Sequence, residues 1–290
     1  KLLMLDAAAG DASLFIHRAE VDDAWSWIDP IIDAWQRPEN KPHGYMAGSW
    51  GPQASAQLMA SDRRRWFSID EVLSGADQEW YAVEDRGEAT FMVSGGSTPE
   101  PLYKALSEVD LPWDSIYVAL VDERWVDFDH DKSNEAFTVK HLIQNKAAVA
   151  NLVGMKNSAE TAAEGVDDCE SAYQQLAQPF DITILGMGSD GHTASLFPYA
   201  QGLDDALNPE SAQLCAAIIA KQSEVTGAIT ERMTLTLAGL LRSKALILLI
   251  TGAEKLAVLR AAQAGTNIQE MPIRAVLQQQ AVPVVVYWAP

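Results

Sequence analysis

The sequence predicts an α/β protein built on a mostly parallel, doubly wound sheet with helices on both faces, preceded by an N-terminal segment of helices and loops. Two observations carry this prediction. From about residue 89 onward, short apolar runs alternate with Gly-rich or acidic turns and with segments of helical periodicity. These runs are rich in Val, Ile and Leu without strict apolar and polar alternation, which is typical of strands covered on both faces.

The composition is that of an ordinary folded protein and narrows the classes of partner. The 290 residues are 48% hydrophobic and 21% charged. With 21 Lys and Arg against 40 Asp and Glu, the formal net charge of −19 repels nucleic-acid backbones and anionic membranes. The chain has no apolar run near the roughly 18 residues of a membrane span, no signal-peptide layout, and only two cysteines, Cys169 and Cys215. We expect a protein of the reducing cytoplasm that binds neither nucleic acid nor membrane.

The first 66 residues differ in composition from the rest, because they hold five of the nine Trp. Apolar residues recur at helical spacing over residues 20–35, although Pro30 should kink or interrupt this helix. Residues 37–52 are rich in Pro and Gly and predict an extended loop, and residues 54–60 predict a short helix. We therefore divide the chain into a segment at 1–66, a junction at 67–85 and an α/β domain at 86–290.

The α/β domain has five expected strands, at residues 89–93, 115–121, 182–185, 245–250 and 282–287. In largely parallel sheets, ligands bind beyond the carboxyl ends of the strands. The turns that follow these strands are therefore where functional residues are expected.

A Gly-rich turn follows the first strand and consists of Ser94, Gly95, Gly96, Ser97, Thr98 and Pro99. Two glycines permit a tight backbone, Ser97 or Thr98 can cap the next helix, and Pro99 suits its first position. Free N–H groups at a helix start, surrounded by hydroxyls, can hold a phosphate without net positive charge. The turn is a candidate anion site, and an ordinary strand-to-helix turn is the alternative.

The second strand is expected to end in Asp122, Glu123 and Arg124. An Arg at the carboxyl end of a strand can form paired hydrogen bonds with a phosphate or an oxyanion. The alternative is that Arg124 neutralises the two acids in a surface network.

The third strand opens into residues 186–198, which contain His192. Three glycines of this segment match G-x-G-x-x-G, but Pro198 comes too soon for the long helix that a dinucleotide site requires. Histidine is the side chain that changes charge nearest neutral pH, so His192, on a Gly-flanked turn beside Asp190, is a candidate general base. The alternative is a structural histidine.

Two further basic residues lie near the later strands. Arg232 precedes an apolar helix, and Lys255 stands just past the fourth strand. A cation at a helix start opposes the helix dipole, so a bound anion explains Lys255 better than stability does, with a solvated surface lysine as the alternative. The other histidines and the cysteines lack metal-ligand spacing, and no Gly-x-Ser-x-Gly elbow is present, so we expect neither a metal nor a serine nucleophile.

Together these motifs resemble the 6-phosphogluconolactonase family over residues 86–290. The resemblance is carried by residues 94–99, by 122–124 with Ser133 and Asn134, and by 186–198, 232–236 and 252–255. Residues 190–198 are the most specific part, whereas the Gly-Gly turn is shared with glucosamine-6-phosphate deaminases. Those deaminases carry Asn-Glu-Pro where this sequence has Leu196, Phe197 and Pro198. The missing acid disfavours isomerase chemistry.

The resemblance implies hydrolysis of 6-phospho-D-glucono-1,5-lactone to 6-phospho-D-gluconate in the oxidative pentose phosphate pathway, without a cofactor. His192 would deprotonate the attacking water, with Arg124 or nearby backbone N–H groups stabilising the oxyanion. Asp190 would orient the imidazole or only shape the turn. The expected ligands of the 6-phosphate are Ser94, Gly95, Gly96, Ser97, Thr98, Arg124 and Lys255, with Arg232 as a secondary candidate. The alternatives are an enzyme like glucosamine-6-phosphate deaminase and a non-catalytic module that binds sugar phosphates.

Residues 1–66 resemble the carboxyl-terminal end of glucose-6-phosphate dehydrogenase, on the strength of residues 10–15, 20–25, 29–31 and 47–52. The parts of that family that bind substrate and coenzyme lie upstream of this end, so no dehydrogenase activity is expected. The resemblance implies a piece of a fusion of two consecutive enzymes, or an association with glucose-6-phosphate dehydrogenase through this segment. Residues 67–87 are short and polar for the strand and helix that precede the Gly-Gly turn in the lactonase family, so an incomplete edge is expected there.

Overall fold

The computed structural model describes residues 82–83 and 85–290, together with residues 26, 29–30, 32–35 and 37 of the amino-terminal part. The chain divides into two units, Lys1–Ser68 and Ile69–Pro290. In the first unit, the described residues between 26 and 35 are helical, Pro30 included, as expected for a helix over residues 20–35. The kink at Pro30, the loop at 37–52, the helix at 54–60 and most of the 67–87 stretch rest on residues outside the described ones.

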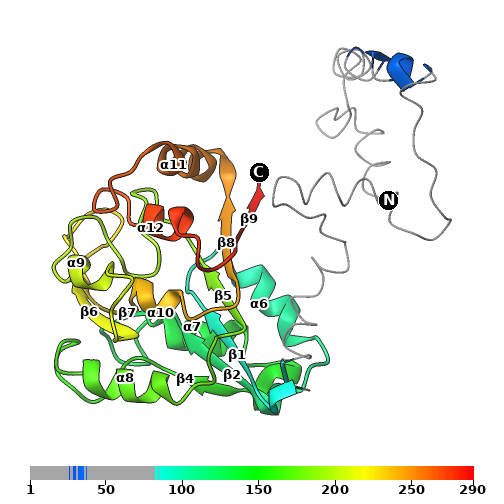
Figure 1. Cartoon of the computed structure of the whole chain (residues 1–290). Coiled ribbons are helices and arrows are strands. Elements are labelled where there is room, and N and C mark those ends of the chain that lie inside the picture. Colours follow the sequence, from blue (N-terminus) through cyan, green and yellow to red (C-terminus); the bar gives the residue numbers. More distant parts are fainter. Residues whose placement is uncertain (1–25, 27–28, 31, 36, 38–81, 84) are drawn as a thin grey trace, which may run out of the picture. The chain divides into compact units, whose positions relative to one another are not determined.

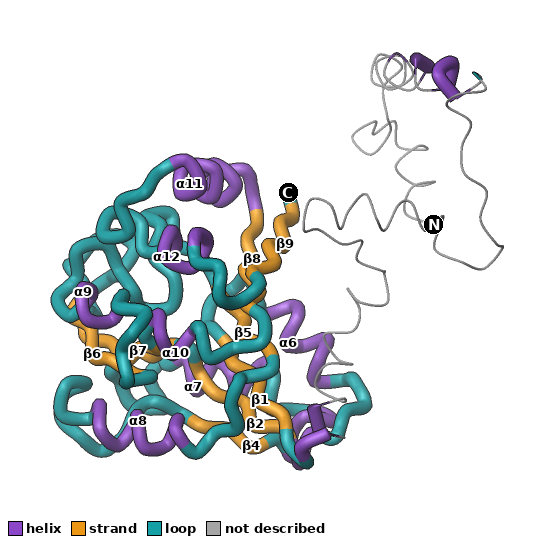
Figure 2. The backbone as a smooth tube through the Cα atoms, viewed as in Figure 1, coloured by secondary structure: helices purple, strands orange, loops and turns teal. Residues whose placement is uncertain are grey.

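The second unit is built on a six-stranded parallel sheet, whose strands follow one another across Figure 2. In spatial order they are β4 (Asn151–Val153), β2 (Ile116–Leu120), β1 (Ala89–Val93), β5 (Ile182–Leu185), β8 (Leu246–Thr251) and β9 (Val284–Ala289). The central strands β1 and β5 are buried along their whole length, which explains their predominantly apolar sequences. The predicted α/β fold class is confirmed, and the five expected strands are all present.

The chain winds outward in two directions from the centre of this sheet (Figure 1). It moves from β1 to β2 and β4, returns to β5 on the other side of β1, and then continues to β8 and β9. Because crossovers between parallel strands are right-handed, the connections of the two halves cover opposite faces of the sheet. The neighbours β1 and β5 form the topological switch point, the place where open α/β sheets generally have a ligand crevice beyond the carboxyl ends of their strands.

The connections carry the helices and short 3₁₀ turns. These are α6 (Glu100–Ser107), η2 (Trp113–Ser115), α7 (Asn134–His141), η3 (Asn145–Val149), α8 (Val166–Gln174), α9 (Leu203–Ala206), α10 (Leu237–Leu240), α11 (Gly252–Ala264) and α12 (Ile273–Gln278). Among the described residues, none of these helices has the length and apolarity of a membrane span.

A second, antiparallel sheet corrects two expectations. It consists of β3 (Asp122–Arg124), β7 (Glu231–Leu235) and β6 (Cys215–Ile219), in the order β3-β7-β6. The second parallel strand therefore ends at Leu120, and Arg124 belongs to a strand of the other sheet. Arg232, expected only to precede a helix, lies within β7, and the helix that follows has four residues. The apolar pattern missed β3 because all three of its residues are charged.

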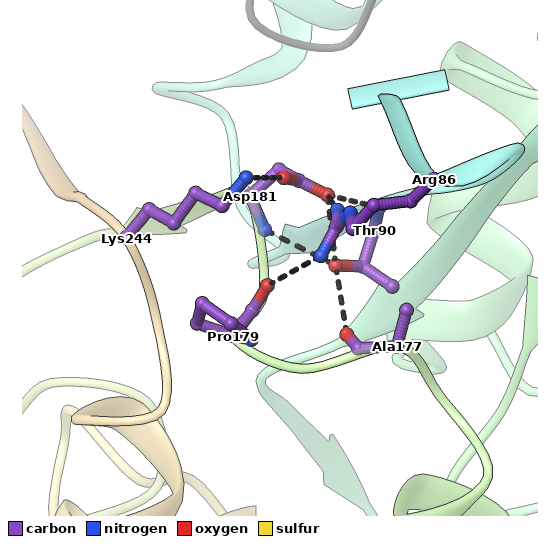
Figure 3. Close-up of polar contacts among 6 residues, drawn as sticks. All are labelled: Arg86, Thr90, Ala177, Pro179, Asp181 and Lys244. Carbon is purple, nitrogen blue, oxygen red and sulfur yellow. Dashed lines mark hydrogen bonds and ion pairs between the residues drawn. The ribbon is translucent and has the colours of Figure 1, made fainter. Parts of the chain in front are cut away.

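One buried carboxylate ties together the amino ends of the central strands (Figure 3). Asp181, directly before β5, is 1% exposed and forms ion pairs with Nη2 of Arg86, which precedes β1, and with Nζ of Lys244, which precedes β8, at 2.8 Å. It also accepts the backbone N–H of Thr90 in β1 at 2.9 Å. Three neighbouring strands are thus joined at the edge of the sheet opposite their carboxyl ends.

We predict that Asp181→Asn lowers the free energy of unfolding by about 3 kcal/mol, because the charges of Arg86 and Lys244 lose their common partner. The midpoint of thermal unfolding, measured by calorimetry, should fall by roughly 6 to 12 °C. The matched control is Asp110→Asn, which breaks an exposed pair with Lys146 (Oδ1 to Nζ 3.8 Å) and should leave the midpoint within about 1 °C. Equal midpoints for the two variants would contradict the structural role of Asp181.

Candidate active site

The turn after β1 lies at the switch point and leaves its polar groups available. The hydroxyl of Tyr103, in α6, accepts the N–H of Ser94 at 3.1 Å and donates to its carbonyl at 2.8 Å. The Ser94 hydroxyl is buried and has no hydrogen-bond partner among the described residues, and Gly96 and Ser97 are exposed. An anion at the switch point would find hydroxyl and N–H donors here.

The expected capping of α6 is wrong in two details. Pro99 occupies the N-cap position rather than the first helical position, and neither Ser97 nor Thr98 caps the helix. The Pro99 backbone is already in the helical region, and its carbonyl accepts the N–H of Tyr103 at 3.0 Å. The two hydroxyls are therefore not used by the helix.

Asn134, the first residue of α7, joins this turn to Arg124. Its Oδ1 accepts a hydrogen bond from Nη1 of Arg124 at 2.7 Å, and its Nδ2 donates to the carbonyl of Asp122 at 2.8 Å. The same Oδ1 lies 2.1 Å from the place that a Cβ on Gly95 would take, so only glycine fits there. These contacts place the Arg124 guanidinium beside the Gly-Gly turn, and no ion pair joins it to Asp122 or Glu123 in the described part of the chain.

The carboxylate of Glu123 is fully buried and anchors the amino terminus of α7. Its Oε1 accepts the N–H groups of Arg124 at 2.8 Å and Asn134 at 2.7 Å. Its Oε2 accepts the N–H of Glu135 at 2.8 Å and the hydroxyl of Ser133 at 3.1 Å. Burial raises the pKa of Glu123 to about 7, although these hydrogen bonds oppose the shift. Glu123 is not among the residues that the sequence predicts for the site.

Arg232 is a buried arginine without a carboxylate partner among the described residues. It is 3% exposed, its Nη2 donates to the carbonyl of Thr226 at 3.0 Å, and its Nε has no partner. The register of β3 with β7 sets it directly opposite Arg124, so two like charges share one face of the sheet. Burial and the charge of Arg124 lower the pKa of Arg232 to about 10. A bound anion would stabilise this arrangement, which is costly in the protein alone.

The loop after β5 presents His192 with one ring nitrogen held and the other available. Nδ1 lies 2.5 Å from Oδ1 of Asp190, which also accepts the backbone N–H of His192 at 3.1 Å. Burial opposes the ionisation of Asp190, but the hydrogen bond and the charge of His192 outweigh it and lower the pKa of Asp190. Nε2 has no hydrogen bond among the described residues, and the His192 side chain is 20% exposed. Asp190 thus both orients the ring and shapes the turn.

Close contacts surround the imidazole. A Cβ on Gly188 would lie 2.0 Å from Nδ1 of His192, so the Asp190–His192 pair requires glycine at this position. The ring of Phe197 lies against the imidazole, with centroids 4.3 Å apart. The guanidinium of Arg232 also lies over the ring of Phe197, 5.6 Å from its centroid. The candidate base and the buried arginine are therefore linked through one aromatic ring.

The histidine loop is also bonded to the antiparallel sheet. The hydroxyl of Ser195 donates to Oδ2 of Asp122 at 2.6 Å, and the Ser195 N–H donates to the hydroxyl of Thr234 at 3.2 Å. Since Asp122 also accepts from Asn134, its strand β3 connects the histidine loop with the Gly-Gly turn.

Lys255 lies apart from this network. It belongs to the first turn of α11, directly after β8, and so stands at the same edge of the sheet. Its ammonium makes no hydrogen bond or ion pair with the described residues. Within that part of the chain, no group of three His, Cys, Asp or Glu side chains is arranged to hold a metal ion.

Comparisons with known proteins match two parts of the chain. Residues 74–288 match the family model for glucosamine-6-phosphate isomerases/6-phosphogluconolactonase, and residues 1–67 match the carboxyl-terminal domain of glucose-6-phosphate dehydrogenase. The chain is 40% identical to the 6-phosphogluconolactonase of Rhizobium meliloti over 209 residues, which are 72% of this chain and 88% of the relative. It is 38% identical to that of Pseudomonas aeruginosa, over 72% of this chain and 84% of the relative.

Among solved structures, a 6-phosphogluconolactonase from Shewanella baltica superimposes with a TM-score of 0.70 at 39% identity. The superposition covers 82% of this chain and 94% of that chain.

We predict that Arg232→Met weakens the binding of inorganic phosphate by about tenfold, because one charge-assisted contact is lost. The midpoint of thermal unfolding should not fall, since the variant removes a buried charge that lies opposite Arg124. Titration calorimetry and differential scanning calorimetry measure the two effects. Arg260→Met, at an exposed position of α11, is the control and should change neither. Unchanged phosphate binding in a less stable Arg232→Met protein would mean that Arg232 serves the fold instead.

Proposed function

Because the chain belongs to the glucosamine-6-phosphate isomerase/6-phosphogluconolactonase family, we propose that it hydrolyses 6-phospho-D-glucono-1,5-lactone to 6-phospho-D-gluconate, with His192 as the general base. Both resemblances seen in the motifs, to the lactonases and to the end of glucose-6-phosphate dehydrogenase, are confirmed by the family matches. The named relatives and the Shewanella baltica structure are 6-phosphogluconolactonases, which supports the lactonase branch of the family.

The observation that carries the mechanism is the available Nε2 of His192, with Nδ1 held by Asp190. With its proton on Nδ1, the imidazole can take a proton from a water molecule at Nε2 as that water attacks the lactone carbonyl. The protonated imidazole can then give this proton to the ring oxygen of the lactone, when the bond between that oxygen and the acyl carbon breaks. A lactone is an activated ester, so a positioned base and an oxyanion site suffice without a covalent intermediate.

Arg124 and Arg232 supply local positive charge in a chain whose formal net charge is −19. Arg124 lies beside the Gly-Gly turn, where it can stabilise the oxyanion or hold the 6-phosphate. Arg232, opposite Arg124 and without an acidic partner in the described part, is assigned to the same anion. The phosphate would lie against the turn formed by Ser94, Gly95, Gly96, Ser97 and Thr98, with Lys255 at the same edge of the sheet.

The neighbour of His192 supports hydrolysis over deamination. Deaminases of this family use a glutamate near the end of the histidine segment, whereas here the buried ring of Phe197 lies against the imidazole. An aromatic ring cannot relay a proton from this position. The base is left with Asp190 as its single acidic partner among the described residues.

For residues 1–66 we propose association with glucose-6-phosphate dehydrogenase, or a covalent fusion that places the producer and the consumer of the lactone on one chain. The match of residues 1–67 to the end of that enzyme supports this proposal. We propose that the protein is cytoplasmic, because a chain of 290 residues with only two cysteines lacks the cysteine-rich composition of disulfide-stabilised secreted proteins.

We predict that His192→Ala lowers the rate of lactone hydrolysis, after subtraction of the spontaneous rate, by about 10³-fold. Its dissociation constant for inorganic phosphate should change by less than about twofold, because the base acts at the acyl carbon and not at the phosphate. Asp190→Asn should lose roughly 10- to 100-fold in rate, since Nδ1 loses its ionised partner. His17→Ala, within the dehydrogenase-like segment, is the control and should match the unmodified chain. A folded His192→Ala protein with the original rate would mean that His192 is not the general base, whereas an unmodified chain without hydrolysis above the spontaneous rate would favour the non-catalytic binding module.

We predict no release of ammonia from glucosamine 6-phosphate above the uncatalysed background. An enzyme-coupled ammonia assay measures this, with the lactone assay on the same sample as the positive control. Ammonia release without lactone hydrolysis would place the chain in the isomerase branch.

A further inference from the structure

We propose that Asn134 is a positioning residue, which sets the Arg124 guanidinium against the Gly-Gly turn, and that the buried carboxylate of Glu123 holds Asn134 in place. The inference rests on the proposed function, because Arg124 is one of the groups that would act on the substrate in lactone hydrolysis.

The side chain of Asn134 is held on every side. It is 3% exposed, its Nδ2 donates to the carbonyl of Asp122, and its Oδ1 lies against the backbone of Gly95. An amide fixed in this way presents its oxygen to Nη1 of Arg124 in one direction only. A single amide group, that of Asn134, therefore fixes the position of the Arg124 guanidinium relative to the Gly-Gly turn.

Arg124 needs such a partner because its side chain is long and has many rotamers. Its other hydrogen bond in the described part goes from the same Nη1 to the carbonyl of Lys132, at 3.1 Å and exposed to solvent. Without Asn134, the guanidinium would be free to leave the turn. The binding of the substrate would then have to offset the conformational entropy that the Arg124 side chain loses when it is ordered. A preorganised guanidinium does not need to move when charge develops on the anion.

Glu123 fixes the backbone that carries this amide. Its two oxygens receive the N–H groups of Arg124 and Asn134 as well as two donors from the start of α7. The hydroxyl of Ser133 meanwhile accepts the N–H of Ala136 at 3.1 Å and so caps the same helix. Glu123 is fully buried and acts on the site only through these neighbours.

The histidine loop does not depend on this amide, because Ser195 bonds it directly to Asp122 and to β7. Loss of the Asn134 amide should therefore disturb the arginine and leave the base in place. Whichever kinetic constant Arg124→Ala changes, kcat or KM, Asn134→Ala should change the same one, and by less.

A double-mutant cycle tests the proposal, with the full chain, Asn134→Ala, Arg124→Ala and the double variant. Lactone kcat and KM are measured for each, and so is the dissociation constant for inorganic phosphate, which needs no turnover. Asn134→Ala alone should lower kcat/KM by about tenfold, as expected for one charge-assisted hydrogen bond. In the Arg124→Ala background the same change should cost less than about twofold, because the interaction it serves is already gone.

If Asn134→Ala does not fold, a more conservative variant and a direct measurement of Arg124 mobility test the same proposal. Asn134→Ser keeps a polar residue at the start of α7, and the mobility of the Arg124 guanidinium is followed by ¹⁵N NMR in this variant and in the unmodified chain. The signal should show greater mobility in Asn134→Ser. Asn151→Ala is the matched control, since it removes a similar bond from Nδ2 to the carbonyl of Asp114 (2.8 Å) at the amino end of β4, and it should alter neither the kinetics nor the signal.

The outcomes separate the inference from the proposed function. Additive effects in the cycle, with an Arg124 signal equally ordered in Asn134→Ser, overturn the positioning role while lactone hydrolysis by the unmodified chain stands. A folded unmodified chain without hydrolysis above the spontaneous rate overturns the proposed function. The phosphate cycle then still decides whether Asn134 acts through Arg124.

Discussion

The parallel pairing of β1 with β5, with Phe91 opposite Ile182 and Met92 opposite Thr183, is the constraint on which the site depends. Two strands far apart in the sequence end at the same edge of the sheet, so the turns that follow them must lie side by side. One turn carries backbone and hydroxyl donors, and the other carries a histidine with its acid. The chemistry of the molecule follows from this one adjacency, because neither turn contains a complete site.

Two basic side chains share an acidic partner at the amino ends of the parallel strands, and two near the carboxyl ends have none among the described residues. At the amino edge, Arg86 and Lys244 share the carboxylate of Asp181 (Figure 3). In the antiparallel sheet, whose strand β3 follows the carboxyl end of β2, Arg124 and Arg232 are paired opposite each other without an acidic partner among the described residues. In a chain of formal net charge −19, acids are abundant, so these unpaired cations are informative. The ion-paired residues at the amino ends stabilise the fold, and the two arginines without acidic partners are suited to bind an anionic ligand.

The sequence predicted the parallel strands and the turns after them, because buried strands leave an unmistakable apolar pattern. It did not predict β3, whose three residues are all charged, or β7, which begins with the charged residues Glu231 and Arg232, because the strand identity comes from pairing partners distant in the sequence. The opposition of Arg124 and Arg232 depends on that pairing register and could not be read from spacing. Ser133, Asn134 and Glu135 do carry a helix-start signal, but nothing in the sequence shows that the carboxylate receiving their donors is Glu123. Most of residues 1–81 lie outside the described residues.

A crystal structure of the chain with bound 6-phospho-D-gluconate would test the proposed arrangement of the site. We predict the phosphate against the Gly-Gly turn within hydrogen-bond reach of an arginine of the Arg124–Arg232 pair. We predict the product carboxylate about 3 Å from Nε2 of His192, directly or through one water molecule. A product bound elsewhere on the chain, or bound at the switch point with its carboxylate remote from His192, would overturn the proposed site and the role of His192 as the base.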